Sequence, residues 1–307
     1  MLQPNITEAI TAVMFHTIGH TFELMKMSWR VLMKDKELIW FPIFGVIGSL
    51  VILGIFFLIA SATGAVDRIQ EITNQQNNTQ AAGQTEAAAN PGDIVLLVLL
   101  YISVYFVTIF FNSALIAAAL ERLRGGDPNI RSGLAVASKH IPQILGWAII
   151  SASVGLLLQI LRSRQDNFLG RMVIDMIGGA WSFMTFFVVP VLVNEGKSPI
   201  GSIKRSASMV RETWGRQITA SFGFQLVYLI AGVIAVLPAF LVFTVFPIGG
   251  IIVGVITVSI ALGVVGALEG IFKAALYEYA LGEKPVEFNT EVLKSAYMTD
   301  LRAQPYR

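Results

Sequence analysis

The sequence of 307 residues contains no cysteine. This absence excludes disulfide bonds, thiolate metal sites, a cysteine nucleophile and S-acylation. Histidine is scarce as well, with only His16, His20 and His140, and their spacing does not resemble a zinc site. Phosphate-loop, dinucleotide, nucleophile-elbow and HExxH patterns are missing, and no two carboxylates are placed for acid–base work. We therefore expect no enzymatic activity, no cofactor and no metal.

Charged residues are also few. They make up 14% of the chain, whereas soluble proteins average about a quarter. The formal net charge of +2 is too small to suggest a nucleic-acid partner. What remains is apolar: 55% of residues are hydrophobic and the mean hydropathy is +0.68. This composition places the chain in the membrane class.

Long apolar runs predict how the chain is built. A helix needs roughly 20 mostly apolar residues to cross the hydrocarbon layer. The runs do not alternate apolar with polar residues as barrel strands do, and helices satisfy their own backbone groups in lipid. We predict an all-α, polytopic integral membrane protein. Its six transmembrane helices are expected at residues 38–60, 94–120, 141–161, 172–193, 218–243 and 249–273.

The distribution of Lys and Arg predicts the orientation. With both termini in the cytoplasm, all but four of the 22 Lys and Arg residues fall in inner segments, as the positive-inside rule requires. Residues 1–37 then form a cytoplasmic segment that contains an amphipathic interfacial helix. Residues 38–281 form the transmembrane domain, which includes a low-complexity outer loop at 61–93. Residues 282–307 form a cytoplasmic tail.

A basic, half-apolar helix precedes every second span, so the order of interfacial helix, span, span is expected three times. The alternative is that the three juxtamembrane helices are unrelated. The similarity of their starting residues would then be a coincidence. Asp127 and Ser198 are the expected caps of the second and third helices, and Phe41–Pro42, Pro142 and Gly215 are the expected joints. The predicted apolar stripes are Ile18, Phe22, Met25, Trp29 and Leu32; Ile130, Leu134, Ala137 and Ile141; and Ile200, Ile203, Ala207, Val210 and Trp214.

Basic residues of these helices have two readings. As a structural brace they fix the orientation of the spans at the inner leaflet. As a binding surface they attract anionic head groups or a membrane-protein partner, at roughly 1 kcal/mol per basic residue. The candidate contact residues are Lys26, Arg30, Lys34, Lys204, Arg205 and Arg211.

Asp175 is the deepest acid in a predicted span, about one turn inside it. An ionisable residue within a membrane is a functional candidate by default. The structural alternative is that Asp175 reaches toward Arg171, four residues earlier on the same helix face. Glu269 and Lys273 form another such pair, which we expect near the inner interface.

Glycine pairs predict close helix packing. Gly250 with Gly254 and Gly266 with Gly270 are small-xxx-small pairs in the sixth span, which should therefore lie centrally. The motif at 178–180 should let the fourth span approach a neighbour without leaving a pocket. A broken helix around a substrate is the weaker reading of residues 247–255.

Four stretches resemble a known protein family: SWRVLMKDKELIWFP (28–42), ALERLRGGDPNIRSGL (119–134), AWSFMTFFVVPVLVNEGKSPIGSIKRS (180–206) and the ALYEYALGEKPVEFN…LKSAY tail (275–297). The family consists of prokaryotic multi-pass membrane proteins and is catalogued as a domain of unknown function. The resemblance implies a prokaryotic plasma membrane and six spans. It implies no activity, ligand or catalytic residue.

These observations favour a non-catalytic membrane scaffold or accessory protein. It would act through glycine-rich packing faces and cytoplasmic basic helices that bind lipid or a partner. The alternative is a transporter or channel for a small solute or lipid. Polar residues that converge on one inward face of several spans would favour the alternative.

Overall fold

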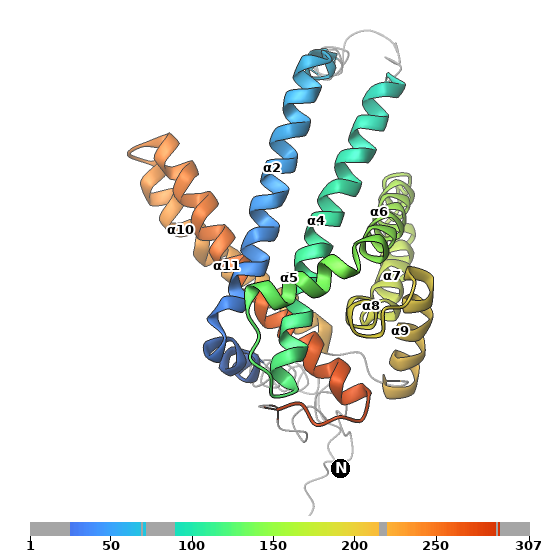
Figure 1. Cartoon of the computed structure of the whole chain (residues 1–307). Helices are drawn as coiled ribbons and strands as arrows, with labels where there is room; N and C mark the ends of the chain where they lie inside the picture. Colours follow the sequence, from blue (N-terminus) through green and yellow to red (C-terminus); the bar gives the residue numbers. More distant parts are fainter. Residues whose placement is uncertain (1–24, 69, 72–89, 215–219, 287, 289–307) are drawn as a thin grey trace, which may run out of the picture.

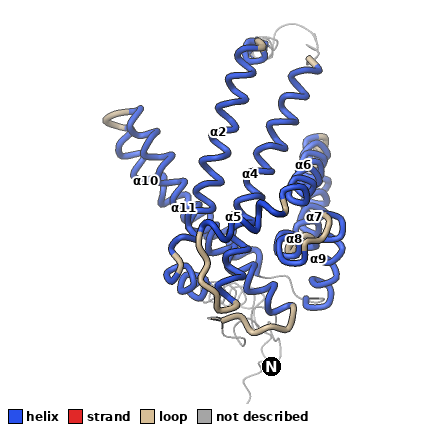
Figure 2. The backbone as a smooth tube through the Cα atoms, viewed as in Figure 1, coloured by secondary structure: helices blue, strands red, loops and turns tan. Residues whose placement is uncertain are grey.

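The computed structural model describes residues 25–68, 70–71, 90–214, 220–286 and 288, without the side chains of 213–226. Its described residues form helices and no strands, which confirms the all-α prediction (Figure 2). Residues 25–34 are helical, and the elements that follow are also helices. They are η1 (Lys36–Ile39), α2 (Trp40–Ala62), α4 (Pro91–Leu123), α5 (Ile130–Lys139), α6 (Ile141–Ser163), α7 (Phe168–Met184), α8 (Val188–Glu195), α9 (Pro199–Trp214), α10 (Ala220–Phe243) and α11 (Pro247–Ala280).

Five helical segments are long and apolar enough to cross a membrane, which indicates a multi-pass membrane protein. They are Lys36–Ala62, Pro91–Leu123, Ile141–Ser163, Phe168–Glu195 and Pro247–Ala280. The fifth predicted span corresponds to helix α10, whose side chains are described from Val227 to Phe243. Helix α11 is continuous, so the broken-helix reading of residues 247–255 is wrong.

The helices form hairpins that diverge from a common base. Figure 1 shows α2 and α4 rising together, α10 and α11 leaning away to one side, and α6 with α7 on the other. Helix α11 contacts α2, α4, α8 and α10, which confirms its central position. The fully buried side chains gather at the base, where these helices meet, and include Phe41, Leu115, Ile116, Phe187, Leu192, Ile271, Leu276 and Tyr277.

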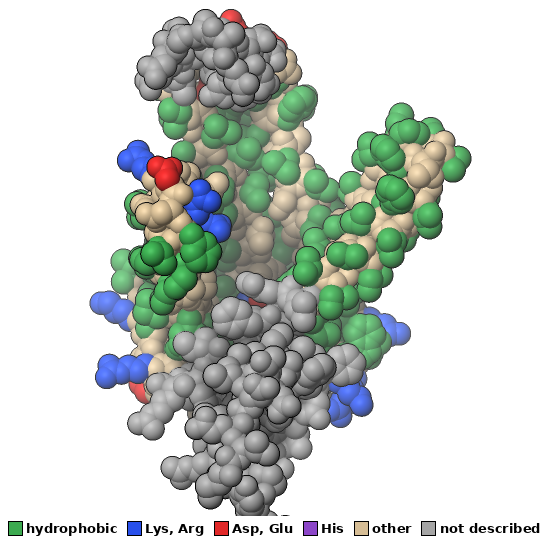
Figure 3. Space-filling model, turned by 180° about the vertical axis from the view of Figure 1, so that it is seen from behind, with side chains coloured by type: hydrophobic (Ala, Val, Ile, Leu, Met, Phe, Trp, Pro, Cys, Tyr) green, Lys and Arg blue, Asp and Glu red, His purple; other side chains and the backbone are tan. Residues whose placement is uncertain are grey.

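Away from the base the helices are covered with exposed apolar side chains. Figure 3 shows hydrophobic atoms along two diverging arms, the α2–α4 hairpin and the α10–α11 hairpin. Leu58 of α2 is 69% exposed and Leu241 of α10 is also 69% exposed. Surfaces of this kind are suited to contact with lipid chains, which are as apolar as the side chains themselves.

Glycines allow close approaches between helices, both at the base and at the tip of the α10–α11 hairpin. A Cβ on Gly270 would lie 2.4 Å from Leu115 Cδ2 of α4, and one on Gly250 would lie 2.4 Å from Phe243 Cα of α10. Both contacts confirm the prediction of close packing in α11. Gly282 has φ 84° and follows the last turn of α11, where its N–H donates to the Tyr279 carbonyl. A glycine in this left-handed conformation is a common way to end a helix.

The interfacial helices differ in detail from the prediction. In the first, Met27, Val31 and Leu32 are buried, whereas Trp29 is 44% exposed. The predicted stripe is therefore confirmed at Leu32 and wrong at Trp29, because positions that pack against the hairpins determine the buried face. Ile18 and Phe22 lie outside the described residues.

The second interfacial helix, α5, is capped by Asn129 rather than by the predicted Asp127. The Asn129 side chain accepts from the Ser132 N–H at 2.9 Å, and Ser132 Oγ accepts from the Asn129 N–H at 3.1 Å. Asp127 instead forms an ion pair with Arg122 at 2.9 Å. In the predicted stripe, Ala137 is buried but Ile141 is 41% exposed.

The third interfacial helix, α9, begins as predicted. Pro199 is its first residue, and Ser198 Oγ accepts from the Gly201 N–H at 3.2 Å. Its buried face differs, because Ser202, Ser206, Met209 and Val210 are buried while Ile200 is 61% exposed. The predicted joint Gly215 lies outside the described residues.

The other two predicted joints are displaced. The first change of direction falls at Asp35, which has φ −122° and ψ 74°, and Pro42 lies within the first turn of α2. The second falls at His140, which ends α5 and precedes α6, and Pro142 follows inside α6. Proline is tolerated in a first helical turn because the N–H groups there have no intrahelical partner.

The predicted fourth span is interrupted rather than continuous. Helix α7 ends at Met184 and α8 begins at Val188. The buried hydroxyl of Ser206, on α9, bridges the interruption: it accepts from the Phe187 N–H at 3.0 Å and donates to the Met184 carbonyl at 2.7 Å. A break inside a membrane-embedded segment is tolerated when side chains satisfy the freed backbone groups, as Ser206 does here.

Candidate functional site

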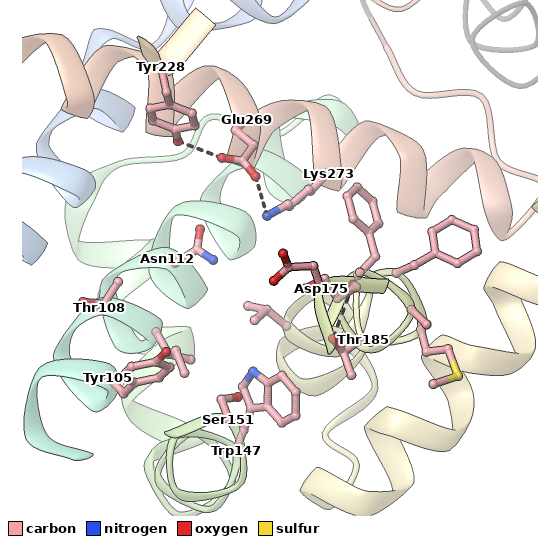
Figure 4. A pocket seen from close by; sticks show the side chains of 18 of the residues that line it. Tyr105, Thr108, Asn112, Trp147, Ser151, Asp175, Thr185, Tyr228, Glu269 and Lys273 are labelled. Atoms are coloured by element: carbon pink, nitrogen blue, oxygen red, sulfur yellow. Dashed lines mark hydrogen bonds and ion pairs between the residues drawn. The ribbon is translucent and has the colours of Figure 1, made fainter. Parts of the chain in front are cut away.

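A large cavity lies between α4, α6, α7 and α11, beside the break between α7 and α8. Its volume is about 1970 Å³, well above the roughly 300–1,000 Å³ of common ligand pockets. Figure 4 shows side chains from these helices pointing into the same space. Apolar side chains dominate the lining, and a smaller number of polar and charged groups is concentrated at two places.

The first polar group is centred on Glu269 of α11. Its carboxylate forms an ion pair with Lys273 at 2.7 Å and accepts a hydrogen bond from the Tyr228 hydroxyl at 2.7 Å (Figure 4). The Lys273 ammonium also lies 5.5 Å from the centre of the Phe186 ring, in a cation–π contact. The predicted pair Glu269–Lys273 is therefore present. It contributes to the cavity wall, a role that the sequence analysis did not assign to it.

The second polar group contains Asp175 of α7. Its carboxylate pairs with Arg162, near the end of α6, at 3.2 Å. The predicted partner Arg171 instead donates its Nε–H to the Gln165 carbonyl at 2.9 Å, so the expectation that Asp175 reaches toward Arg171 is wrong. The physical reason is the short α6–α7 connection, which brings Arg162 beside α7 and offers Arg171 a backbone acceptor. Helix α7 begins at Phe168, so Asp175 lies about two turns inside it.

Uncharged polar groups lie between these two charged groups. Asn112 of α4 contributes to the lining, and its amide makes no hydrogen bond to any other residue that the structure describes. The Ser151 hydroxyl of α6 is buried and likewise lacks a partner within the described part of the chain. Tyr105 lines the cavity, and its hydroxyl accepts a hydrogen bond from the Tyr101 hydroxyl at 3.2 Å. Unpaired amide and hydroxyl groups in a cavity are available to a ligand.

The apolar walls are rich in aromatic side chains. Trp147 of α6 stacks on Trp181 of α7 with ring centres 6.1 Å apart, and Phe272 of α11 lines the cavity. Gly179 also lines it, and a Cβ added there would meet nothing within 4 Å. The prediction that the motif at 178–180 packs without leaving a pocket is therefore wrong at Gly179. Gly178 does approach α6, where its Cβ would lie 3.5 Å from Leu158 Cδ1.

The six predicted basic contact residues do not line this cavity. Lys26, Arg30 and Lys34 are exposed on the helix at 25–34, and Lys204 and Arg211 are exposed on α9. These two helices lie on opposite sides of the base (Figure 1). Arg205 is half-buried and pairs with Glu195 at 3.3 Å. The six residues thus form two separate groups, and in one of them Arg205 already has an acidic partner.

The base carries ion pairs that the sequence analysis did not identify. Arg124 of α4 pairs with the buried Glu278 of α11 at 2.6 Å, and Arg122 pairs with the buried Asp35. Glu195 receives hydrogen bonds from Lys197 at 2.5 Å and from Tyr277 at 3.0 Å. Charge counting assigned Arg122 and Arg124 to the inner side but contained no information about their partners. Among the described residues there is no group of three or more His, Asp or Glu that could hold a metal ion.

Comparison with known protein families gives a match for this chain. The profile of a family described as "Family of unknown function (DUF6159)" matches residues 92–286, which is more than half of the chain. The chain belongs to this family. The DUF6159 match spans α4 to α11 and therefore includes the cavity, while the segment 28–42 lies outside it. Comparisons with curated proteins and with solved structures found no match.

Proposed function

We propose that this DUF6159 protein is a non-catalytic transporter that binds an amphiphilic solute, such as a lipid, in the cavity between α4, α6, α7 and α11. The observation that carries the proposal is the composition of the cavity wall, in which aromatic and aliphatic side chains surround two charged groups. A charge within a membrane costs roughly 2.5–3.5 kcal/mol on the insertion scale. Charged residues at such a position are therefore expected to serve a bound solute or its path.

The interruption between α7 and α8 supports the same function. Phe186, which lies in the interruption, and Thr185 line the cavity, as Met184 does at the end of α7. Discontinuous helices beside a binding site are typical of secondary transporters, in which freed backbone groups and mobile half-helices adjoin the substrate. Here the buried Ser206 satisfies those backbone groups, which provides a stable position for the break.

A cavity-filling variant tests this function. Gly179→Phe places a ring in the cavity, because a Cβ there meets no atom within 4 Å. Gly54→Phe is the matched control, since Gly54 is equally open but lies on the exposed face of α2. Native mass spectrometry should show an amphiphile retained at fixed stoichiometry by the wild type and by Gly54→Phe, and lost from Gly179→Phe. Equal retention by all three proteins would exclude the cavity as the binding site.

The scaffold function predicted from the sequence is a second candidate, which the exposed basic side chains favour. Lys26, Arg30, Lys204 and Arg211 are exposed at the base, where anionic head groups or a partner membrane protein could contact them. Replacing these four residues with Gln should reduce the co-purification of phosphatidylglycerol or of a partner. Unchanged co-purification would argue against this role. Because surface contacts are screened by salt, the effect should also be smaller at high ionic strength.

The topology that fits either function has six spans, with α10 as the fifth, and both termini in the cytoplasm of a prokaryotic cell. The positive-inside distribution supports this orientation. The order of interfacial helix, span, span supports three repeats.

A further inference from the structure

Two ion pairs border the cavity from different helices. Glu269 and Lys273 both belong to α11, whereas Asp175 of α7 pairs with Arg162 of α6. Figure 4 shows that Lys273 and Asp175 extend toward one another across the cavity, with Asn112 nearby on α4. The cavity lining as a whole presents charges of both signs, with Arg162, Arg171 and Lys273 beside Asp175 and Glu269.

The two ion pairs leave different hydrogen-bonding positions available to a ligand. Glu269 has two partners, Lys273 and the Tyr228 hydroxyl, and its side chain is 29% exposed. If a ligand drew the Lys273 ammonium away, Glu269 would keep its bond to Tyr228. Lys273 has three N–H donors, of which the ion pair with Glu269 uses one. On the other side, Asp175 is about half exposed and has four acceptor positions, which its 3.2 Å contact with Arg162 does not fill.

This charge arrangement selects against a ligand of one sign. A purely anionic head group at Lys273 would be close to the Asp175 carboxylate, and a purely cationic group at Asp175 would be close to Lys273. Like charges disfavour each other strongly where water is scarce. A ligand that carries both signs is complementary to both residues at once.

We infer that the cavity binds the head group of a zwitterionic phospholipid, an inference that rests on the transport function proposed above. The phosphate of the lipid contacts Lys273 and the amide of Asn112, and its ammonium group contacts Asp175. The acyl chains lie along the aromatic wall that contains Trp147, Phe183 and Phe272. The exposed apolar faces of the diverging arms give the chains a route to the bilayer (Figure 3).

A lipid-selectivity measurement tests the head-group assignment. Wild-type protein is incubated with equal amounts of phosphatidylethanolamine and phosphatidylglycerol, and the retained ratio is measured by native mass spectrometry. The wild type should prefer phosphatidylethanolamine. Asp175→Asn should lower this preference about fivefold, which corresponds to about 1 kcal/mol. Asp166→Asn is the matched control, because Asp166 is an exposed acid in the α6–α7 loop outside the cavity lining, and it should leave the ratio unchanged.

Three outcomes separate the inference from the function on which it rests. If Gly179→Phe abolishes retention but Asp175→Asn does not change the ratio, the cavity binds lipid and the head-group assignment is wrong. If Gly179→Phe has no effect, the cavity function itself fails. Phosphoethanolamine, which has no acyl chains, should not displace the lipid at equal concentration. Displacement by it would show that the site takes a soluble zwitterion and would overturn the lipid assignment.

Discussion

Single polar residues have structural effects in this chain because few polar partners exist to replace them. Ser206 illustrates the point: its side chain is fully buried and satisfies one donor and one acceptor at the break between α7 and α8. The Arg124–Glu278 pair has a comparable role between α4 and α11, since the carboxylate is buried. A polar group left without a partner in such surroundings raises the free energy of the folded state.

Ser206→Ala should therefore destabilise the protein by about 1–3 kcal/mol, because the Phe187 N–H and the Met184 carbonyl lose their partner. The measurement is the thermal unfolding temperature in detergent. Ser208→Ala on the same helix is the control, since the Ser208 hydroxyl donates to Glu212 on the surface. Equal unfolding temperatures for Ser206→Ala and Ser208→Ala would show that the break does not depend on the hydroxyl.

At the scale of elements, the sequence predicted helix type and order well, because an apolar run of about 20 residues has few alternatives in lipid. The buried faces of the helices and the residues at which they end were predicted less well. Trp29 was assigned to the buried stripe from its spacing, yet neighbouring hairpins bury Met27 and Val31 instead. The break after Met184 has no proline or glycine within it, but Pro190 follows in the first turn of α8 and has no N–H to donate to the Phe186 carbonyl. Ser206, on another helix, satisfies the backbone groups of Met184 and Phe187, and this contact is one that a local pattern cannot reveal.

Prediction of the cavity would have required the same kind of information about contacts between separate helices. Asp175 was identified as a candidate because it is an acid in an apolar run, and Glu269 with Lys273 because of their spacing. Their association with Arg162 and Tyr228 arises from separate helices. Sequence reasoning therefore named four of the five charged residues that line the cavity, Arg171, Asp175, Glu269 and Lys273, and assigned Asp175 the wrong partner.

Packing of α5 on the hairpins depends on Gly133, which the sequence analysis did not select. A Cβ at this position would lie 2.7 Å from the Ala114 carbonyl oxygen of α4 and 2.6 Å from Phe41 Cζ. The backbone oxygen cannot move aside independently of α4. Gly133→Ala should therefore destabilise the protein by about 1–3 kcal/mol, measured by thermal unfolding, despite the better helix propensity of alanine. Gly54→Ala, in open surroundings, should be neutral or stabilising; a stabilising Gly133→Ala would contradict this packing.

At the scale of the whole molecule, the packed base and the diverging arms differ in the residues that they bury and expose. The base contains the fully buried side chains and most of the ion pairs that join separate helices, so it has one well-defined arrangement. The arms expose their apolar residues. The cavity lies between α4, α6, α7 and α11. This distribution is expected of a protein whose base lies toward the cytoplasm and whose arms lie in lipid.

Thiol labelling tests that placement directly, because the chain has no cysteine of its own. Asp166 lies in the α6–α7 loop and Glu283 follows α11, and both are exposed. In intact cells, an impermeant thiol reagent should label Asp166→Cys and should label Glu283→Cys only after the cells are permeabilised. Labelling of Glu283→Cys alone would invert the topology. Labelling of both from outside would mean that an even number of crossings separates the two positions, so that one of the three predicted spans between them, such as α10, does not cross and the six-span arrangement fails.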